Sequence, residues 1–305
     1  MHIIFEPGFF SSLPVRNALA LGAVVSLVSA VVGIFTVIRS QSFAGHALTD
    51  VATTGGAAGA FFGINPLVAF IGGATLGGGS MELIGVQRAH QRDVATGIVL
   101  GAATGISALY LYLDTTSSAS TGVTQQILFG SIFSLAPSTL PAATLTGAGV
   151  LMVIATIWRP LLLSSFSFDV ASARGIRTRA IGVVFMLAMS VSVGLSSLAI
   201  GSILSTALLI GPAATALRAT RSIRAAVVVS CCLGVLATWL GILLAYDSYD
   251  WNPSSQGLPV SFFVVVVVFA MYLVSGLPVF RRRAKVARPV TTITASPSRA
   301  SRTVL

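Results

Sequence analysis

Long apolar runs recur along almost the whole chain, and they constrain its fold more than any other feature. The runs are roughly 17 to 25 residues long, and a bilayer core needs about 20 residues of helix with every backbone group paired. Only 9% of the residues are charged, where a soluble domain has about a quarter. The mean hydropathy is +0.93. The sequence therefore predicts an all-α integral membrane protein.

Nine runs are predicted to cross the membrane as a polytopic helical bundle. They cover about residues 17–38, 49–63, 65–86, 93–113, 138–158, 178–197, 199–217, 224–245 and 259–277. The second run is short for a bilayer, so we expect eight or nine transmembrane helices. Residues 125–141 are too short to cross and are interrupted by glycine and proline, which favours a hairpin or re-entrant piece on the outer face.

The formal net charge of +10 would suit nucleic-acid binding if the cations formed one patch. They lie instead in alternate connections, as cytoplasmic loops of membrane proteins do. These cations are Arg88, Arg92, Arg159, Arg174, Arg177, Arg179, Arg218, Arg221, Arg224, Arg281, Arg282, Arg283, Lys285 and Arg288. We therefore expect a multi-pass protein of the cytoplasmic membrane with its C-terminus inside, and no nucleic-acid partner. Arg16 is the exception, because this topology places it outside.

The chain is predicted to have one structured part. Residues 1–285 are expected to form a transmembrane domain. Residues 286–305 consist largely of Thr, Ser, Pro, Ala and Arg and offer little apolar surface to bury, so we expect a disordered cytoplasmic tail.

His46 and Asp50 are the candidate metal ligands, in an otherwise apolar and glycine-rich stretch. They stand four residues apart, so on a helix both side chains share one face. Imidazole and carboxylate ligands suit zinc, manganese or ferrous iron. A charged Asp near mid-bilayer costs about 2.5–3.5 kcal/mol on insertion scales, which indicates a function. In the alternative interpretation, Asp50 turns a loop and His46 begins a water-exposed helix.

Small residues at every fourth position predict close helix packing. The motifs are Gly55/Gly59/Gly63, Gly73/Gly77 and Gly97/Gly101/Gly105. The pair Gly211 and Pro212 interrupts a later apolar run, because proline frees a carbonyl and kinks a helix. This pair is either a hinge or a fit to a bent neighbour. Cys231 and Cys232 are adjacent and match no metal-ligand spacing, so core packing is expected.

Four stretches in this order resemble the membrane permease subunits of bacterial ABC importers for zinc, manganese or iron. They are SFAGHALTDVATTGGAAGAFFG, ILFGSIFSL, SFDVASARGI and IGSILSTALLIGPAATALRA, and the resemblance covers about residues 15–283. The family usually has Asp first and His four residues later. Here His46 comes first and Asp50 second, which keeps the shared helix face and leaves the metal preference open.

The resemblance implies a homodimer that works by alternating access with cytoplasmic ABC ATPase subunits and an extracytoplasmic metal-binding protein. The metal is then cargo, no cofactor is bound permanently, and the chain is not itself an enzyme. Its one lysine, Lys285, follows alanine, so no phosphate-binding loop ending in Gly-Lys is present.

The resemblance also implies a docking site for the ATPase in the segment DVASARG, with Asp169, Ala171, Ala173 and Gly175. The alternative is a plain surface helix that Asp169 stabilises near its N-terminal end.

Two other functions are weighed against an ABC permease. An ion- or proton-coupled secondary metal carrier could use His46 and Asp50 as a proton relay. Such carriers often contain two similar halves with paired broken helices, and we find no convincing internal repeat. A membrane scaffold without transport would leave the two polar residues unexplained.

Overall fold

The computed structural model describes residues 9, 12–84, 89–118, 121–130, 132–251 and 257–276. In these ranges the regular elements are helices, which confirms the all-α fold class. The helices are α1 (Leu13–Ile38), α2 (Ser42–Phe62), α3 (Pro66–Ile84), α4 (Ala89–Ser118), α5 (Thr121–Phe129), α6 (Thr139–Thr156), α7 (Trp158–Phe166), α8 (Phe168–Ala173), α9 (Thr178–Ile200), α10 (Ser202–Ala219), α11 (Ile223–Trp251) and α12 (Val260–Ser275). The predicted tail, residues 286–305, lies outside the described residues.

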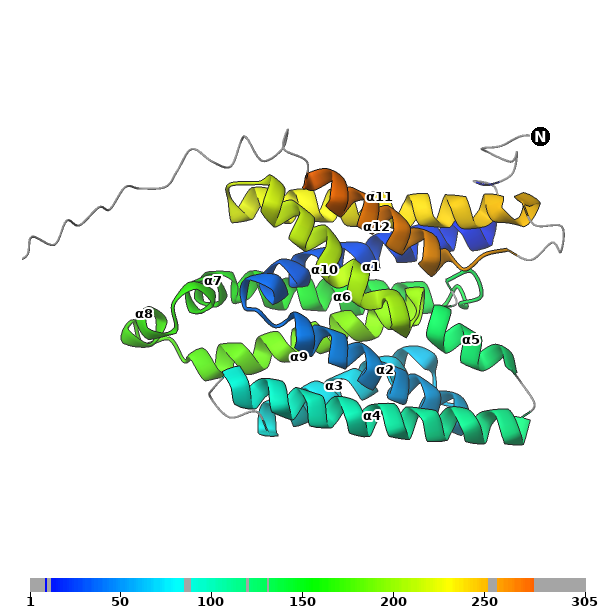
Figure 1. The fold of residues 1–305 in the computed structure, drawn as a ribbon, viewed down its shortest axis with the longest axis horizontal. Coiled ribbons are helices and arrows are strands. Elements are labelled where there is room, and N and C mark those ends of the chain that lie inside the picture. Colours follow the sequence, from blue (N-terminus) through cyan, green and yellow to red (C-terminus); the bar gives the residue numbers. More distant parts are fainter. Residues whose placement is uncertain are drawn as a thin grey trace, which may run out of the picture.

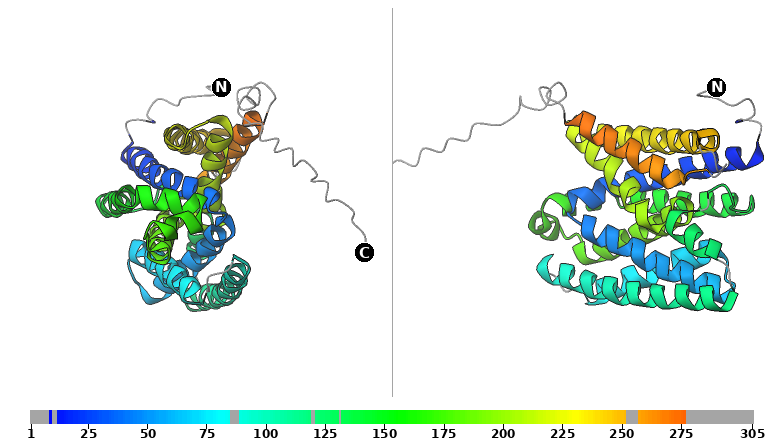
Figure 2. Two further views of the ribbon diagram at one scale, coloured as in Figure 1. Left: turned by 90° about the vertical axis from the view of Figure 1, so that its left-hand side faces the viewer. Right: turned by 45° about the vertical axis from the view of Figure 1, so that its right-hand side comes forward.

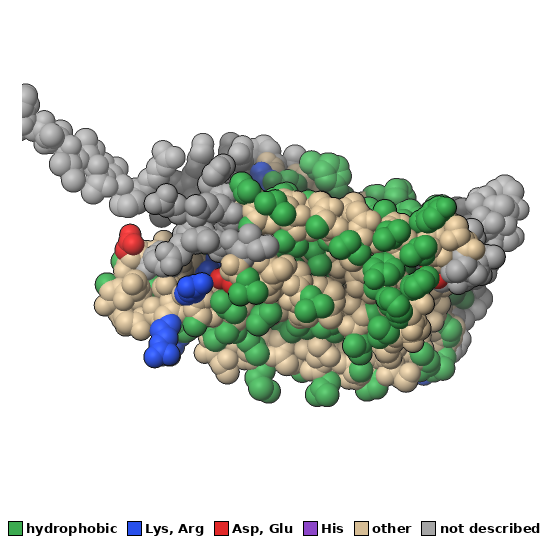
Figure 3. Space-filling view, turned by 90° about the horizontal axis from the view of Figure 1, so that it is seen from below, with side chains coloured by type: hydrophobic (Ala, Val, Ile, Leu, Met, Phe, Trp, Pro, Cys, Tyr) green, Lys and Arg blue, Asp and Glu red, His purple; other side chains and the backbone are tan. Residues whose placement is uncertain are grey.

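The long helices run roughly along one direction, with α7 and α8 at one end of the bundle and α5 toward the other (Figures 1 and 2). Helix α1 packs against α6, α9, α10 and α11, and α2 packs against α3, α4, α9 and α10. On the face in Figure 3, Lys and Arg side chains gather toward the end that carries α7 and α8. Apolar side chains are spread over the remaining length of that face, as a surface in contact with lipid requires.

Six helical segments among the described residues are long and apolar enough to cross a membrane. They are α1, α6, α9, α10, residues Asp93–Thr116 of α4 and residues Ile223–Tyr249 of α11. Helix α12 has only 16 residues, and α2 carries His46, Asp50 and many Gly and Thr residues that lower its hydropathy. The predicted count of eight to nine crossings is therefore not confirmed.

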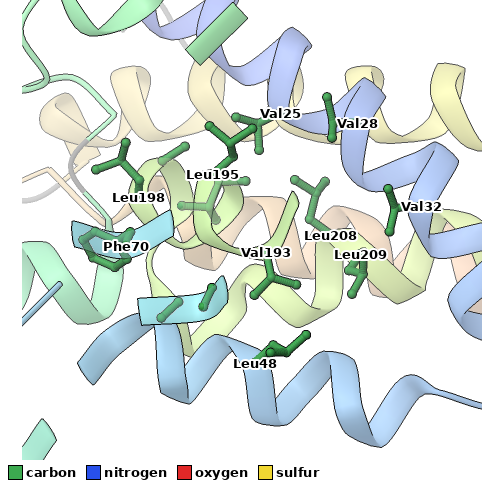
Figure 4. Packing of buried hydrophobic residues seen from close by; sticks show 14 of the residues in the cluster. Val25, Val28, Val32, Leu48, Phe70, Val193, Leu195, Leu198, Leu208 and Leu209 are labelled. Atoms are coloured by element: carbon green, nitrogen blue, oxygen red, sulfur yellow. The ribbon is translucent and has the colours of Figure 1, made fainter. Parts of the chain in front are cut away.

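The core is aliphatic and joins helices that are distant in the sequence. Val25, Val28 and Val32 of α1 face the core, where side chains of α9 and α10 such as Leu195 and Leu208 meet them (Figure 4). All five are at most 5% exposed. Burying such a side chain contributes about 1.5–3 kcal/mol in water, but within a bilayer close packing and interhelical hydrogen bonds carry more of the stability.

The prediction of close packing is confirmed for α2 against α3, but the three glycines of α4 do not pack against another described helix of this chain. A Cβ atom at Gly55 would overlap the backbone of Gly73, and one at Gly77 would overlap Val51. Gly63 does not pack: its φ of +67° ends α2 in the left-handed conformation. At Gly97, Gly101 and Gly105 a Cβ atom would meet no described atom of this chain within 4 Å, because this side of α4 faces outward.

Two glycines lie where the C-terminal end of α5 contacts the short connection between α9 and α10. Gly130 has a φ of +86° and Gly201 a φ of +91°, and each lies against the backbone of the other's segment. Gly201 also has a ψ of 159°, a combination that glycine alone adopts readily. Helix α5 has nine residues, so, as predicted, this piece is too short to cross.

We expect Gly201→Ala to destabilise the protein by about 1–3 kcal/mol through backbone strain alone. The new Cβ atom would also overlap the carbonyl oxygen of Leu128. Thermal unfolding of the purified protein in detergent measures the effect. Gly149→Ala is the matched control, because Gly149 is exposed on α6 and a Cβ there meets nothing within 4 Å. Equal unfolding midpoints for the two variants would contradict the assigned backbone conformation.

Candidate functional site

Helix α2 carries both predicted metal ligands. The second apolar run was expected to begin near residue 49, but the helix starts at Ser42 and includes His46 and Asp50. A Cβ atom at Gly45 would lie 2.9 Å from Cδ2 of Leu209, so the glycine lets α10 pack against this first part of α2. His46 and Asp50 therefore lie one helical turn apart within a packed helix, as the hypothesis of a shared face requires.

His46 is exposed and lines a groove of about 540 Å³ between α2, α10 and α12. The walls are mainly aliphatic and aromatic. The other lining residues are Ile203, Thr206, Ala207, Ile210, Gly211, Ala214, Val265, Val268, Phe269 and Tyr272. An imidazole in such a groove can reach an ion or a partner that enters from the side.

Thr206 and Thr49, which were not predicted as site residues, lie next to His46. Its Nδ1 atom lies 3.2 Å from Oγ1 of Thr206 on α10, and Oγ1 of Thr49 lies 3.0 Å from the same oxygen. The Thr49 hydroxyl also donates to the backbone carbonyl of His46. Thr206 lies in the stretch IGSILSTALLIGP, where it is polar in an apolar run, but only the packing of α10 on α2 brings it to His46.

Asp50 is half-buried one turn further along α2 and does not line the groove. Residues four apart on a helix are neighbours on its surface, so the carboxylate of Asp50 lies beside the imidazole of His46. Thr54, a further turn along, donates to the carbonyls of Asp50 and of Ala103, which joins α2 to α4. Among the described residues, no group of three or more His, Cys, Asp or Glu side chains could hold a metal. One chain thus offers two candidate ligands.

The Gly211–Pro212 pair lies within α10, which continues through it to Ala219. A Cβ atom at Gly211 would overlap Val268 of α12, so the glycine is needed for close packing of these two helices. Gly211 also lines the groove beside His46. The packing interpretation therefore has direct support, and the hinge remains a prediction.

The predicted docking segment forms the short helix α8. Oγ of Ser167 accepts a hydrogen bond from the Val170 backbone at 3.3 Å, and Asp169 occupies the first turn. Gly175, with a φ of +75°, ends the helix, because Ile176 N–H donates to the Ala171 carbonyl and Gly175 N–H to that of Ser172.

The four predicted docking residues thus have different places in α8. Asp169 and Ala173 are exposed, Ala171 is fully buried, and Gly175 shapes the turn. Two apolar side chains here were not among the predicted docking residues: Phe166 is 67% and Val170 46% exposed. An exposed apolar pair at the end of the bundle is a surface that a partner protein could cover.

Arg39 links α7 to the connection between α1 and α2. It ends α1 just before α2, and its Nη1 atom donates to the Ser164 and Ser165 hydroxyls of α7 at 3.1 and 3.4 Å. Its guanidinium carbon lies 5.4 Å from the Phe185 ring centroid on α9. Arg39 therefore joins α7 and α9 to the connection between α1 and α2.

Six apolar helical segments among the described residues and a groove open to the side are the features of a multi-pass helical membrane protein. Residues 13–275 match the model of the ABC 3 transport family, and the chain belongs to this family. The resemblance that the sequence motifs indicated is thereby confirmed.

Named relatives agree with this assignment. The chain is 31% identical over 235 residues to the manganese import system permease protein ScaB of Streptococcus parasanguinis, covering 76% of this chain and 81% of ScaB. It is 27% identical over 236 residues to the high-affinity zinc uptake system membrane protein ZnuB of Haemophilus influenzae, covering 76% of this chain and 88% of ZnuB. The structure of PsaBC from Streptococcus pneumoniae in complex with Fab shares the fold, with a TM-score of 0.77 and 24% identity over 90% of this chain and 95% of that chain.

Proposed function

We propose that this chain is the membrane-spanning subunit of an ATP-driven importer for a divalent transition metal: manganese, zinc or iron. The observation that carries the proposal is His46, which is exposed in an open groove with Asp50 one turn away. Membership in the ABC 3 transport family supports an ABC permease over the secondary carrier. Relatives named for manganese import and zinc uptake support a metal as the cargo.

A second copy of the chain would complete the metal path. Two candidate ligands in one chain are too few to hold a dication stripped of water. Two copies that face one another across their grooves would offer two imidazoles and two carboxylates, a mixed set that suits these metals. A transport site must also release its ion, so exchangeable waters in the remaining positions fit the task better than a closed cage.

Energy would come from a separate ATPase that docks at α8. ATP-driven movement of the docking helix would reach α2 through α7 and Arg39. The two copies would then alternate between outward-open and inward-open arrangements, with an extracytoplasmic binding protein delivering the metal. In this mechanism the chain moves an ion and catalyses no bond-making step.

Metal accumulation in a deletion strain tests the proposed function. We expect the strain to grow poorly on chelator-treated medium and to be rescued by adding one of manganese, zinc or iron. Uptake of that metal should return with the intact chain and should stop when cellular ATP is depleted while the proton gradient is maintained. Uptake that follows the proton gradient instead would support a secondary carrier. Absence of a phenotype with all three metals would support a scaffold.

A further inference from the structure

We propose that Thr206 and Thr49 are positioning residues for His46. They hold its imidazole in the tautomer with hydrogen on Nδ1, so that Nε2 is free to bind the metal. This inference rests on the proposed function and deepens it, because it specifies which atom of the site meets the ion. It follows from the chain of hydrogen bonds that links α2 to α10.

The direction of each hydrogen bond follows from counting protons. A backbone carbonyl only accepts, so Thr49 must give its one hydroxyl hydrogen to the carbonyl of His46. Thr49 can then only accept from Thr206, 3.0 Å away. Thr206 has thereby used its one hydrogen, so it can only accept from Nδ1 of His46 at 3.2 Å. Nδ1 must therefore carry a hydrogen, and in the neutral ring Nε2 carries the lone pair.

This tautomer is the one that a metal ligand in the groove needs. Hydrogen bonding at one ring nitrogen fixes the orientation of a metal-binding histidine and raises the basicity of the other nitrogen. Nδ1 is engaged with α10, whereas His46 as a whole is exposed to the groove. Nε2 is thus the nitrogen available to an ion.

Thr206 differs from most other threonines in these helices. The hydroxyls of Thr53, Thr146 and Thr215 each donate to the carbonyl four residues earlier in their own helix. Such bonds are the ordinary way in which a hydroxyl is satisfied in a membrane helix. The hydrogen bonds of Thr206 instead cross to α2, where both partners belong to the turn that contains His46.

Uptake kinetics of Thr206→Val and Thr206→Ser test the positioning role. Valine keeps the branched shape and removes the hydroxyl, so we expect KM for the metal to rise about tenfold, as for other groups that orient metal ligands. Serine keeps the hydroxyl and should restore KM. The maximal rate should change by less than about twofold in both variants, since the bundle and its docking helix are unaltered. Thr104→Val is the control, because the exposed Thr104 bonds only its own helix, at Leu100.

The tautomer itself can be observed without transport. Full-length protein with His2→Gln and His90→Gln retains His46 as its one histidine, and ¹⁵N NMR of the metal-free protein in lipid nanodiscs reports which ring nitrogen is protonated. At a pH where the ring is neutral, we expect hydrogen on Nδ1 in the parent and a shift toward the Nε2–H form in Thr206→Val. An Nε2–H ring in the parent would overturn the inference, as would parental KM in Thr206→Val.

These outcomes separate the inference from the proposed function. If His46→Ala transports metal at the parental rate, His46 is not a ligand and the proposed site fails, whatever its tautomer. If His46→Ala abolishes uptake while Thr206→Val keeps the parental KM and tautomer, the site stands and the positioning role of the threonines is overturned.

Discussion

Replacing either His46 or Asp50 by alanine is expected to abolish metal uptake while leaving membrane insertion and ATPase association intact. In the part of the chain that the structure describes, no third His, Cys, Asp or Glu joins these two candidate ligands, so the loss of one removes two of four in the proposed dimer. His46 is exposed and makes one hydrogen bond to another helix, at Thr206, and Asp50 is half-buried. Neither residue belongs to the apolar core, so the alanine variants leave the packing of the bundle in place. Uptake of radiolabelled manganese, zinc and iron at matched expression measures the effect.

Asp50→Asn separates charge from shape in this prediction. It keeps the size and removes the negative charge that offsets a dication in a medium of low dielectric constant, so we expect a loss nearly as large as with alanine. Asp93→Asn is the control, because Asp93 is exposed at the start of α4. The double exchange His46→Asp with Asp50→His should retain much of the transport, since both ligands stay on one face. Parental uptake of all three metals by both alanine variants would exclude the proposed site.

Features within one segment could be predicted from the sequence, because they depend on local hydropathy and spacing. The apolar runs indicated an all-helical membrane protein, and the four-residue spacing placed His46 and Asp50 on one face of α2. The small-residue spacing was less reliable. Gly55 packs against α3 as predicted, whereas Gly101, with the same spacing, faces outward. Small residues at every fourth position allow another helix to pack closely, but whether a helix lies there depends on the rest of the fold.

Features that depend on two segments at once were missed. Thr206 lies 160 residues from His46 in the sequence, and the two side chains meet only because α10 packs on α2. The paired glycines Gly130 and Gly201 appeared in two of the resembling stretches, but their contact across the junction required the three-dimensional fold. Gly175 was assigned to docking, although it also ends α8 as a left-handed glycine. Its role in the turn is independent of any partner.

Placing an arginine on α8 is expected to prevent ATPase binding. Val170 is 46% exposed between the exposed Phe166 and the end of the helix. If the ATPase covers this apolar surface, Val170→Arg buries an unpaired charge in the interface and should weaken the complex at least about tenfold, or about 1.4 kcal/mol. Deletion of residues 167–177 should abolish binding and uptake entirely. Co-purification of the ATPase with the permease from membranes measures both variants.

Ala225→Arg is the matched control for this experiment. Ala225 is exposed in the first turn of α11, beside the basic connection from α10, so it tests whether added charge near the membrane surface disturbs assembly in general. A merely structural α8 would give a different pattern: Val170→Arg would leave the ATPase bound, because the new side chain could extend into water from this exposed position. The docking hypothesis therefore requires loss of the ATPase with Val170→Arg and its retention with Ala225→Arg. Binding that survives both Val170→Arg and the deletion would exclude α8 as the docking helix.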